Sequence, residues 1–180
     1  MRINAGRFRN HNIDITNLET TRETSDKVRQ AIFNLIGQFF DGEIALDLFA
    51  GSGAMGLEAL SRGCGKCYFN DLNSKALSVV KKNIAKLKLN DECILINKDY
   101  KDCLNDLKGL KMDLIFLDPP YNMTNVDEIL KLIYDNDLLN KKGIISFEME
   151  KNTNPESDYF TILKDRTYGI KRVVIYKSKE

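Results

Sequence analysis

Residues 47–56 of the chain read Asp-Leu-Phe-Ala-Gly-Ser-Gly-Ala-Met-Gly, and this stretch decides the fold. It begins inside a short apolar run, Ile44–Phe49, and leads into a helical pattern at Met55–Ser61. Glycine is needed where a backbone turns sharply or lies against a ligand, because a Cβ would be in the way. The three glycines therefore predict a strand–turn–helix unit whose turn meets a ligand at the carboxyl edge of a sheet.

Gly51, Gly53 and Gly56 satisfy the spacing GxGxxG, and Asp71 follows 20 positions after Gly51. An acid there, at the end of the next strand, is typical of sites that hold the hydroxyls of a ribose-bearing cofactor. Asp47 comes just before the turn, where it would repel a pyrophosphate but attract a sulfonium or ammonium group. The position of Asp47 therefore favours S-adenosylmethionine over NAD as the ligand. The alternative to ligand binding is that the glycines only form a tight connection between strand and helix.

The rest of the chain alternates between apolar strands and helical patterns. The expected strands are Ile44–Phe49, Lys66–Phe69, Cys93–Asn97, Met112–Leu117 and Gly143–Phe147, and the expected helices are Met55–Ser61, residues 77–89, Tyr100–Leu107 and Val126–Tyr134. Continuous apolar strands separated by helices indicate a parallel sheet covered on both faces. Tyr159–Leu163 and Arg172–Tyr176, joined by a turn at Thr167–Gly169, predict a hairpin. We therefore expect an α/β fold with a doubly wound, mostly parallel, Rossmann-like sheet and an antiparallel C-terminal hairpin.

The N-terminal part does not follow this alternation. Residues 1–23 mix bases, Asn and Thr, and predict a basic arm or hairpin around Gly6–Arg9. A helix is expected from Thr24 or Ser25, with apolar residues at helical spacing as far as Phe39 and a stop at Asp41-Gly42. We therefore expect an arm over residues 1–23 and a single domain over residues 24–180.

Composition agrees with one globular domain, since the chain has 180 residues, 43% of them hydrophobic and 29% charged. The formal charge is only +1, yet residues 1–13 carry three bases and no acid, and residues 161–180 carry six bases and two acids. Two basic ends could bind a polyanion or merely keep the termini soluble, and charge alone does not decide. No apolar run approaches the roughly 20 residues that cross a bilayer, so we expect a cytoplasmic protein.

Cys64 and Cys67 have the CxxC spacing of redox pairs and half zinc sites. A structural zinc needs four ligands, yet there is no second CxxC and the only histidine is the distant His11. We expect no metal site and instead small buried or half-buried thiols.

Asp118-Pro119-Pro120-Tyr121 directly follows the apolar strand at Met112–Leu117. Prolines fix φ and donate no hydrogen bond, so this corner presents its carbonyl groups rigidly. The Asp118 carboxylate and the Pro119 carbonyl could accept both protons of an amine on an aromatic ring, which directs the nitrogen lone pair at a methyl group, and Tyr121 could stack on the base. Such a displacement depends on alignment and electrostatic fit. The alternative is a simple proline-rich strand end.

The glycine turn, Asp71 and the Asp118–Tyr121 corner resemble those of class I methyltransferases that modify exocyclic amines. More narrowly, the chain resembles the RsmD-type enzymes, which methylate N2 of a guanine in 16S ribosomal RNA. Gly6–Arg9 resembles their basic-aromatic arm, and Arg22–Asn34 resembles their R-P-T-x-D-R-V-R-E-x-x-F-N helix start. Glu23 replaces the usual proline of that motif and Gln30 the usual glutamate.

The resemblance implies S-adenosyl-L-methionine as cofactor and 16S rRNA as substrate, within a small ribosomal subunit particle, with no membrane and no obligate protein partner. It implies a catalytic corner made of Asp118, Pro119, Pro120 and Tyr121. The implied cofactor residues are Thr24, Asp47, Phe49, Ala50, Gly51, Ser52, Gly53, Asp71, Leu72, Asp99, Tyr100 and Asp118. The implied RNA contacts are Arg7, Phe8, Arg9, Arg22 and Arg29. For two residues an alternative stays open: Asp99 could simply cap the next helix, and Phe8 could anchor the arm.

Other activities share some of these features. A DNA or RNA adenine-N6 methyltransferase has the same kind of corner, although the DNA enzymes generally need an additional target-reading segment. A protein glutamine methyltransferase usually has Asn at the position of Asp118. An NAD-binding oxidoreductase would explain the glycine spacing but not Asp118–Tyr121, and a non-catalytic RNA-binding module would explain only the basic ends.

Overall fold

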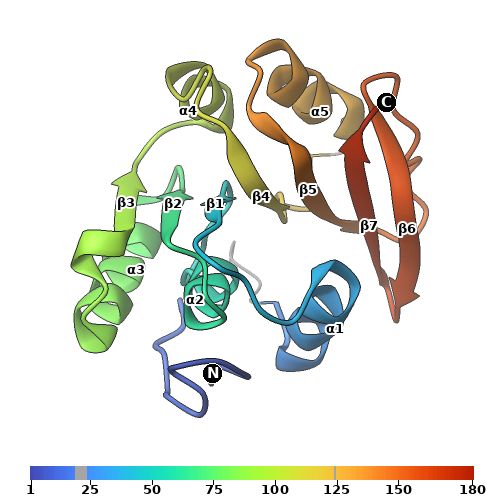
Figure 1. Ribbon diagram of the computed structural model, residues 1–180. Coiled ribbons are helices and arrows are strands. Elements are labelled where there is room, and N and C mark those ends of the chain that lie inside the picture. The colour runs from blue at the N-terminus through green and yellow to red at the C-terminus, as the bar shows by residue number, and fades with distance from the viewer. Residues whose placement is uncertain (19–23, 124) are drawn as a thin grey trace.

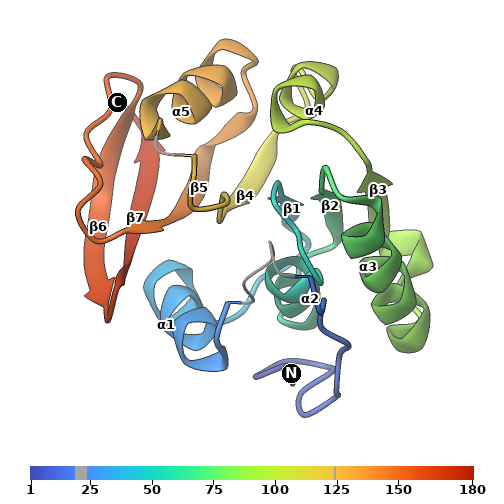
Figure 2. The same cartoon turned by 180° about the vertical axis from the view of Figure 1, so that it is seen from behind.

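The computed structural model describes residues 1–18, 24–123 and 125–180, which contain one mixed sheet with helices on both faces (Figures 1 and 2). The strand order is β3-β2-β1-β4-β5-β7-β6. The first five strands pair in parallel, and β7 is antiparallel to both of its neighbours. The expected doubly wound sheet with an antiparallel C-terminal hairpin is therefore confirmed.

The elements alternate along the chain much as the apolar pattern predicts. The strands are β1 (Ile44–Asp47), β2 (Lys66–Asn70), β3 (Cys93–Ile96), β4 (Met112–Leu117), β5 (Leu139–Glu150), β6 (Phe160–Tyr168) and β7 (Lys171–Ser178). The helices are α1 (Asp26–Ile36), α2 (Ala54–Ser61), α3 (Ser74–Leu87), α4 (Tyr100–Asp106) and α5 (Val126–Asp135), with a 3-10 turn η1 at Asn90–Glu92. Side-chain oxygens of Ser25, Asn73, Asp99 and Asn125 cap four of these helices at their N-termini.

Helices α1, α2 and α3 cover one face of the sheet, and α4 and α5 cover the other (Figures 1 and 2). Side chains of β4 alternate between the two layers, since Leu114 and Phe116 belong to one apolar cluster and Ile115 and Leu117 to the other. Both faces of this strand are buried, which explains why its sequence is a nearly continuous apolar run.

The strand order reverses at the centre of the sheet, because β1 lies between β2 and β4. In doubly wound sheets the crevice outside the carboxyl ends of such strands is where ligands bind. Asp47 is the last residue of β1, and Asp118 follows the last residue of β4. The topology therefore brings the two sequence motifs to one place.

Residues 1–13 form a hairpin around Gly6–Arg9, whereas the last five residues of the predicted arm, 19–23, lie outside the described residues. The backbone N–H of Ile3 donates to the carbonyl of His11, and that of Asn10 donates to the carbonyl of Ile3. The turn packs against the end of α2, where a Cβ on Gly6 would come within 1.8 Å of the Ser61 carbonyl oxygen. Gly6 also has a φ of +85°, so only glycine fits this close contact.

The predicted end of the first helix is wrong. We expected it to run as far as Phe39, but α1 ends at Ile36, and Phe39 is 68% exposed. Gly37, which comes next, adopts a φ of +128° and donates its N–H to the Phe33 carbonyl. A glycine in this conformation ends a helix, so the stop comes earlier than Asp41-Gly42.

Strand β5 is longer than predicted because it pairs on both sides. Leu139 and Ile144–Phe147 pair with β4, and the extension at Glu148–Glu150 pairs with Lys171–Val173 of β7. The hairpin also differs in detail, since β6 continues through Tyr168 and the turn lies at Gly169-Ile170. Strands β5 and β7 therefore include residues, such as Glu148 and Lys171, that lie outside the predicted strands.

Within the described part of the chain, no helix has both the length and the apolar composition that a crossing of the membrane requires.

Candidate active site

A cavity of about 720 Å³ lies at the carboxyl ends of the central strands, where the strand order reverses. This volume is within the range of about 300–1,000 Å³ that small-molecule sites have. It is lined by most of the predicted cofactor and catalytic residues, namely Thr24, Asp47, Phe49, Ala50, Gly51, Asp71, Leu72, Asp99, Tyr100, Asp118, Pro119, Pro120 and Tyr121. The glycine turn and the Asp-Pro-Pro-Tyr corner thus share one cavity.

Two residues of the predicted cofactor loop, Ser52 and Gly53, do not line this cavity. Ser52 is fully buried, and its carbonyl accepts a hydrogen bond from Asn83 of α3 at 3.0 Å. Gly53 caps α2 in the left-handed region, at a φ of +83°. Both residues shape the turn instead of facing the cavity, because the turn presents Ala50 and Gly51.

Asp71 is held at the cavity by two backbone groups. Its Oδ2 accepts from the N–H of Gly51 at 2.9 Å, and its Oδ1 accepts from the N–H of Asn73 at 2.8 Å. Each carboxylate oxygen has a second lone pair, so the group can still accept from a ligand hydroxyl. The acid and the glycine turn, which lie 20 residues apart, are therefore one unit.

Asp47 and Asp99, two further predicted acids, also accept hydrogen bonds from backbone N–H groups. Oδ2 of the buried Asp47 accepts from the N–H of Gly56 in the first turn of α2, at 3.1 Å. Asp99 caps α4 by accepting from the N–H of Lys101 at 2.9 Å, as the alternative interpretation proposed, and it also lines the cavity. A role in contacting adenine remains a prediction for Asp99.

The carboxylate of Asp118 lies between two donors. Its Oδ1 accepts from the Lys171 ammonium group at 2.9 Å, and its Oδ2 accepts from the Thr24 hydroxyl at 3.2 Å. Its side chain is 20% exposed, so it reaches the cavity. Tyr121 is 45% exposed, and the Lys171 nitrogen lies 5.5 Å from the centre of its ring.

Sequence reasoning missed Glu148, which lies on β5 and lines the same cavity. The residue is only 3% exposed, and its Oε1 lies 3.3 Å from the Thr24 hydroxyl. Burial, together with repulsion from Asp118, raises the pKa of Glu148 well above its usual range, although Lys171 acts in the opposite direction. An acid ending an apolar run at the carboxyl edge is the signal that could have revealed it.

Lys171, the first residue of β7, was counted only among the basic residues of the tail. Burial lowers the pKa of its ammonium group, but the carboxylates of Asp118 and Glu148 outweigh burial, and the pKa is raised. The Lys171 nitrogen is 3.8 Å from Glu148. The Lys171 ammonium group therefore forms an ion pair with both acids and lies closer to Asp118 than to Glu148.

Ser146, two residues before Glu148 on β5, supplies a polar atom without a partner. Its Oγ is buried and has no hydrogen-bond partner among the described residues, yet the residue lines the cavity. Buried polar groups are normally hydrogen-bonded, so this hydroxyl is available to a polar group of a ligand in the cavity. This atom and the carboxylates of Asp47 and Asp71 suit a ligand that carries both hydroxyl and cationic groups.

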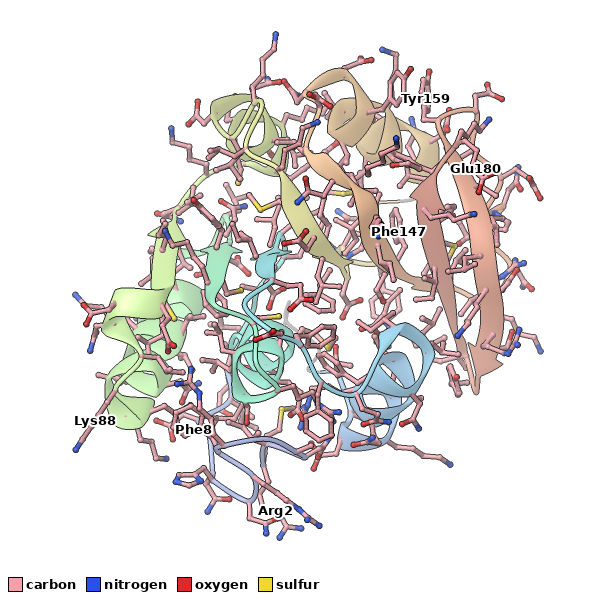
Figure 3. All side chains as sticks on the ribbon, in the orientation of Figure 1. Arg2, Phe8, Lys88, Phe147, Tyr159 and Glu180 are labelled. Carbon is pink, nitrogen blue, oxygen red and sulfur yellow. The ribbon has the colours of Figure 1, made fainter. Side chains whose placement is uncertain are left out.

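The arm residues predicted to contact RNA lie away from this cavity. The backbone N–H groups of Arg7 and Phe8 bond to Ser61, the last residue of α2, whereas the cavity is at the start of that helix. The Phe8 ring packs against the apolar cluster on that side, which supports the anchor alternative. Figure 3 shows Phe8 at the end of the molecule opposite Tyr159. Arg9 is exposed.

Arg22 lies outside the described residues, and the prediction that Arg29 contacts RNA is wrong. The Arg29 side chain is fully buried between α1 and α2. Its guanidinium group donates to Glu58 at 3.2 Å and to Asp26 at 2.9 Å. These bonds hold the guanidinium group inside the protein, where a phosphate could not reach it.

The four cysteines are free, and Cys64, Cys67 and Cys103 are buried, as expected. Burial raises the pKa of Cys64 and of Cys103 to about 12, so these thiols stay protonated and unreactive near neutral pH.

Comparison with known proteins gives consistent matches over nearly the whole chain. A family model described as "Conserved hypothetical protein 95" matches residues 1–177. The Ribosomal RNA small subunit methyltransferase D of Haemophilus influenzae is 33% identical over 99% of this chain and 94% of its own length. YlbH of Bacillus subtilis is 37% identical, covering 99% of this chain and all of YlbH. The solved structure of yhhF from Escherichia coli superposes with a TM-score of 0.88 at 27% identity, covering 99% and 98% of the two chains.

Proposed function

This chain belongs to the Conserved hypothetical protein 95 family, and from that premise and the shared cavity we propose that it is an rRNA methyltransferase. It transfers a methyl group from S-adenosyl-L-methionine to the exocyclic N2 amine of a guanine in 16S rRNA. A relative of 33% identity over almost its full length carries the name of a small-subunit rRNA methyltransferase. The observation that carries the proposal is that Asp118 and Pro119 line the same cavity as Asp71 and the glycine turn.

The residues around the cavity suit the cofactor. Asp71 accepts from the ribose hydroxyls, and Asp99 accepts from the adenine amine. Asp47, Thr24 and Ser146 also line the cavity, and we assign them to the cationic amino-acid end of the cofactor. When bound, the cofactor supplies an electrophilic methyl group whose bond to sulfur breaks as the bond to nitrogen forms.

The corner after β4 prepares the nucleophile. The lone pair of an amine on an aromatic ring is delocalised, so the nitrogen is a poor nucleophile until its protons are held. The Asp118 carboxylate and the Pro119 carbonyl accept the two N–H groups, and Pro120 keeps the backbone rigid. Tyr121 is exposed enough to stack on the base, a contact worth about 1–3 kcal/mol. The proton that the nitrogen loses passes to Asp118, which already accepts its hydrogen bond.

The proposal extends to how the RNA is presented. The substrate is 16S rRNA within a small ribosomal subunit particle in the cytoplasm, and the target guanine leaves its stack to reach the corner. Residues 24–180 act as one methyltransferase domain, and residues 1–23 act as an arm. Arg7 and Arg9 on that arm contact phosphates and add salt-sensitive affinity.

Methyl transfer from radiolabelled S-adenosylmethionine tests the proposal, with small ribosomal particles, naked 16S rRNA and DNA as substrates. Label in the particles that digests to N2-methylguanine is the expected result. Label in N6-methyladenine would establish the adenine alternative instead, and label in none of the three substrates would refute methyl transfer to nucleic acid.

An Asp118→Ala variant tests the corner. We expect a loss of about 100- to 1,000-fold in kcat, because an acceptor aimed at the reacting amine is removed. Cofactor affinity, measured by calorimetry, should stay close to the unmodified protein because the Asp71 side of the cavity is intact. Asp158→Ala, at an exposed position, is the matched control. Transfer by Asp118→Ala at nearly the original rate would disprove the proposed role of Asp118.

A further inference from the structure

Four side chains from four separate segments meet at one end of the cavity. Thr24 precedes α1, Asp118 follows β4, Glu148 is on β5, and Lys171 begins β7. Thr24 Oγ1 lies 3.2 Å from Asp118 Oδ2 and 3.3 Å from Glu148 Oε1. Two carboxylates therefore share one hydroxyl group.

If Asp118 and Glu148 are both ionised, there are too few hydrogen atoms for both contacts of Thr24 Oγ1 to be hydrogen bonds. A threonine hydroxyl has one proton to donate, and an ionised carboxylate can only accept. With two ionised carboxylates, one of the two Thr24 contacts would be an oxygen facing an oxygen without a hydrogen between them. A proton on one carboxyl group removes this conflict and makes both contacts hydrogen bonds.

Glu148 is better placed than Asp118 to hold that proton. The Lys171 nitrogen is 2.9 Å from Asp118 but 3.8 Å from Glu148, so it favours the negative charge on Asp118. The Glu148 side chain is 4% exposed, against 20% for Asp118, so ionising Glu148 costs more solvation. Burial and the charge of Asp118 accordingly raise the pKa of Glu148.

We propose that Glu148 is a positioning residue that keeps its proton at neutral pH and donates it to Thr24 Oγ1, so that the Thr24 hydroxyl donates to Asp118. Lys171 donates to the other Asp118 oxygen, and the carboxylate is fixed from both sides as an ionised acceptor. The role in catalysis rests on the proposed function, because the group that Asp118 receives is the target amine. The protonation state of Glu148 is a property of the protein alone.

The surrounding charges set how this chain of hydrogen bonds depends on pH. Asp118 and Asp47 oppose a negative charge on Glu148, while Lys171 and the Thr24 hydroxyl favour one. The phenol ring of Tyr121, beside Lys171, is a further titratable group at this end of the cavity. When Glu148 ionises at alkaline pH, Thr24 loses its donor and its own proton is drawn to either acid. Asp118 is then held less firmly.

Infrared difference spectroscopy of the protein without cofactor or RNA tests the protonation state directly. At neutral pH we expect the carbonyl stretch of a protonated carboxylic acid in the unmodified protein and its absence in Glu148→Gln. Glu150→Gln, an exposed position on the same strand, is the matched control and should keep the band. A spectrum without this band in the unmodified protein, or a band that persists in Glu148→Gln, would overturn the proposal.

Kinetics test the positioning role. Glu148→Ala should lower kcat by about 10- to 100-fold, the effect of one hydrogen bond to a charged network. Glu148→Gln should recover most of that loss, because its amide N–H can donate to Thr24 where the acid O–H does. We expect kcat/KM of the unmodified protein to fall at alkaline pH as Glu148 ionises. This fall should disappear in Glu148→Gln and persist in Glu150→Gln. If Glu148→Gln is as slow as Glu148→Ala, Glu148 acts as an ionised acceptor and the proposal is wrong.

The infrared and the kinetic experiments together separate this inference from the proposed function. A protein that transfers no methyl group to RNA would refute the function, while the infrared band would still report on Glu148. Active protein without the band would refute only the role of Glu148.

Discussion

Glu58 and Glu148 are both almost completely buried, but their surroundings differ. Glu58 on α2 is 0% exposed and Glu148 on β5 is 3% exposed. Glu58 accepts from the guanidinium groups of Arg29 at 3.2 Å and Arg62 at 2.9 Å. Glu148 has one lysine at 3.8 Å, and that lysine lies closer to a second acid, Asp118.

Backbone N–H groups add to the compensation of the charge on Glu58. The N–H groups of Asn4 and Ala5 in the arm also donate to the carboxylate of Glu58. Its charge is thus compensated by two cations and two dipoles, which join the arm to α1 and α2. A buried charge that is fully paired holds segments together, whereas one that is underpaired changes its protonation state. The first arrangement serves stability here, and the second lies at the cavity where we propose catalysis.

Breaking the Glu58 cluster should have the largest effect. Glu58→Gln leaves Arg29 and Arg62 buried without their shared anion, which should lower the free energy of unfolding by about 3–5 kcal/mol. Urea unfolding followed by circular dichroism measures the change. Glu156→Gln, at an exposed position, should change the stability by less than about 0.5 kcal/mol. A loss no greater in Glu58→Gln than in this control would contradict the structural role of the cluster.

Glu148 should instead show itself in how stability depends on pH. Because its pKa is raised in the folded protein, the native state holds more protons than the unfolded state above the ordinary carboxyl pKa. Its stabilising contribution is complete below that ordinary pKa and is lost as the pH rises towards the folded pKa. The slope for one proton is at most about 1.4 kcal/mol per pH unit.

Urea unfolding over a series of pH values measures that slope. In Glu148→Gln the carboxyl group is absent, so stability should depend less on pH in this range than in the unmodified protein or in Glu150→Gln. Identical slopes in all three proteins would show that Glu148 is ionised in the folded state like an ordinary carboxylate.

The sequence predicted the parts of the fold and site that are local in the chain. The apolar run Met112–Leu117 predicts a buried parallel strand by itself, and its bounds are those of β4. Asp118 and Tyr121 could be assigned to one corner because they are adjacent to that strand. The 20-residue spacing from Gly51 to Asp71 is one βαβ unit, so their contact could also be expected.

The remaining features depend on contacts between distant segments. Lys171 meets Asp118 across 53 positions, and Thr24 meets Glu148 across 124. These pairs form only because β7 turns back against an extended β5 and α1 begins at the same edge of the sheet. Arg29 was expected to contact RNA because of the family resemblance. Nothing near it in the chain indicates burial, and its partner Glu58 lies 29 positions further on.

The smallest effect should come from the exposed arginine of the arm, the counterpart of the buried Arg29. Arg7 pairs with Glu92 at 2.7 Å, but its side chain is 47% exposed, so water and salt weaken this ion pair. Arg7→Ala should cost about 0.2–1 kcal/mol of stability, and a double-mutant cycle with Glu92→Ala measures the coupling. If Arg7 also contacts an RNA phosphate, the slope of log affinity against log salt for 16S rRNA should fall by about one in Arg7→Ala. An unchanged slope would restrict Arg7, like Arg29, to holding the protein together, and the RNA would then have to be bound nearer the cavity.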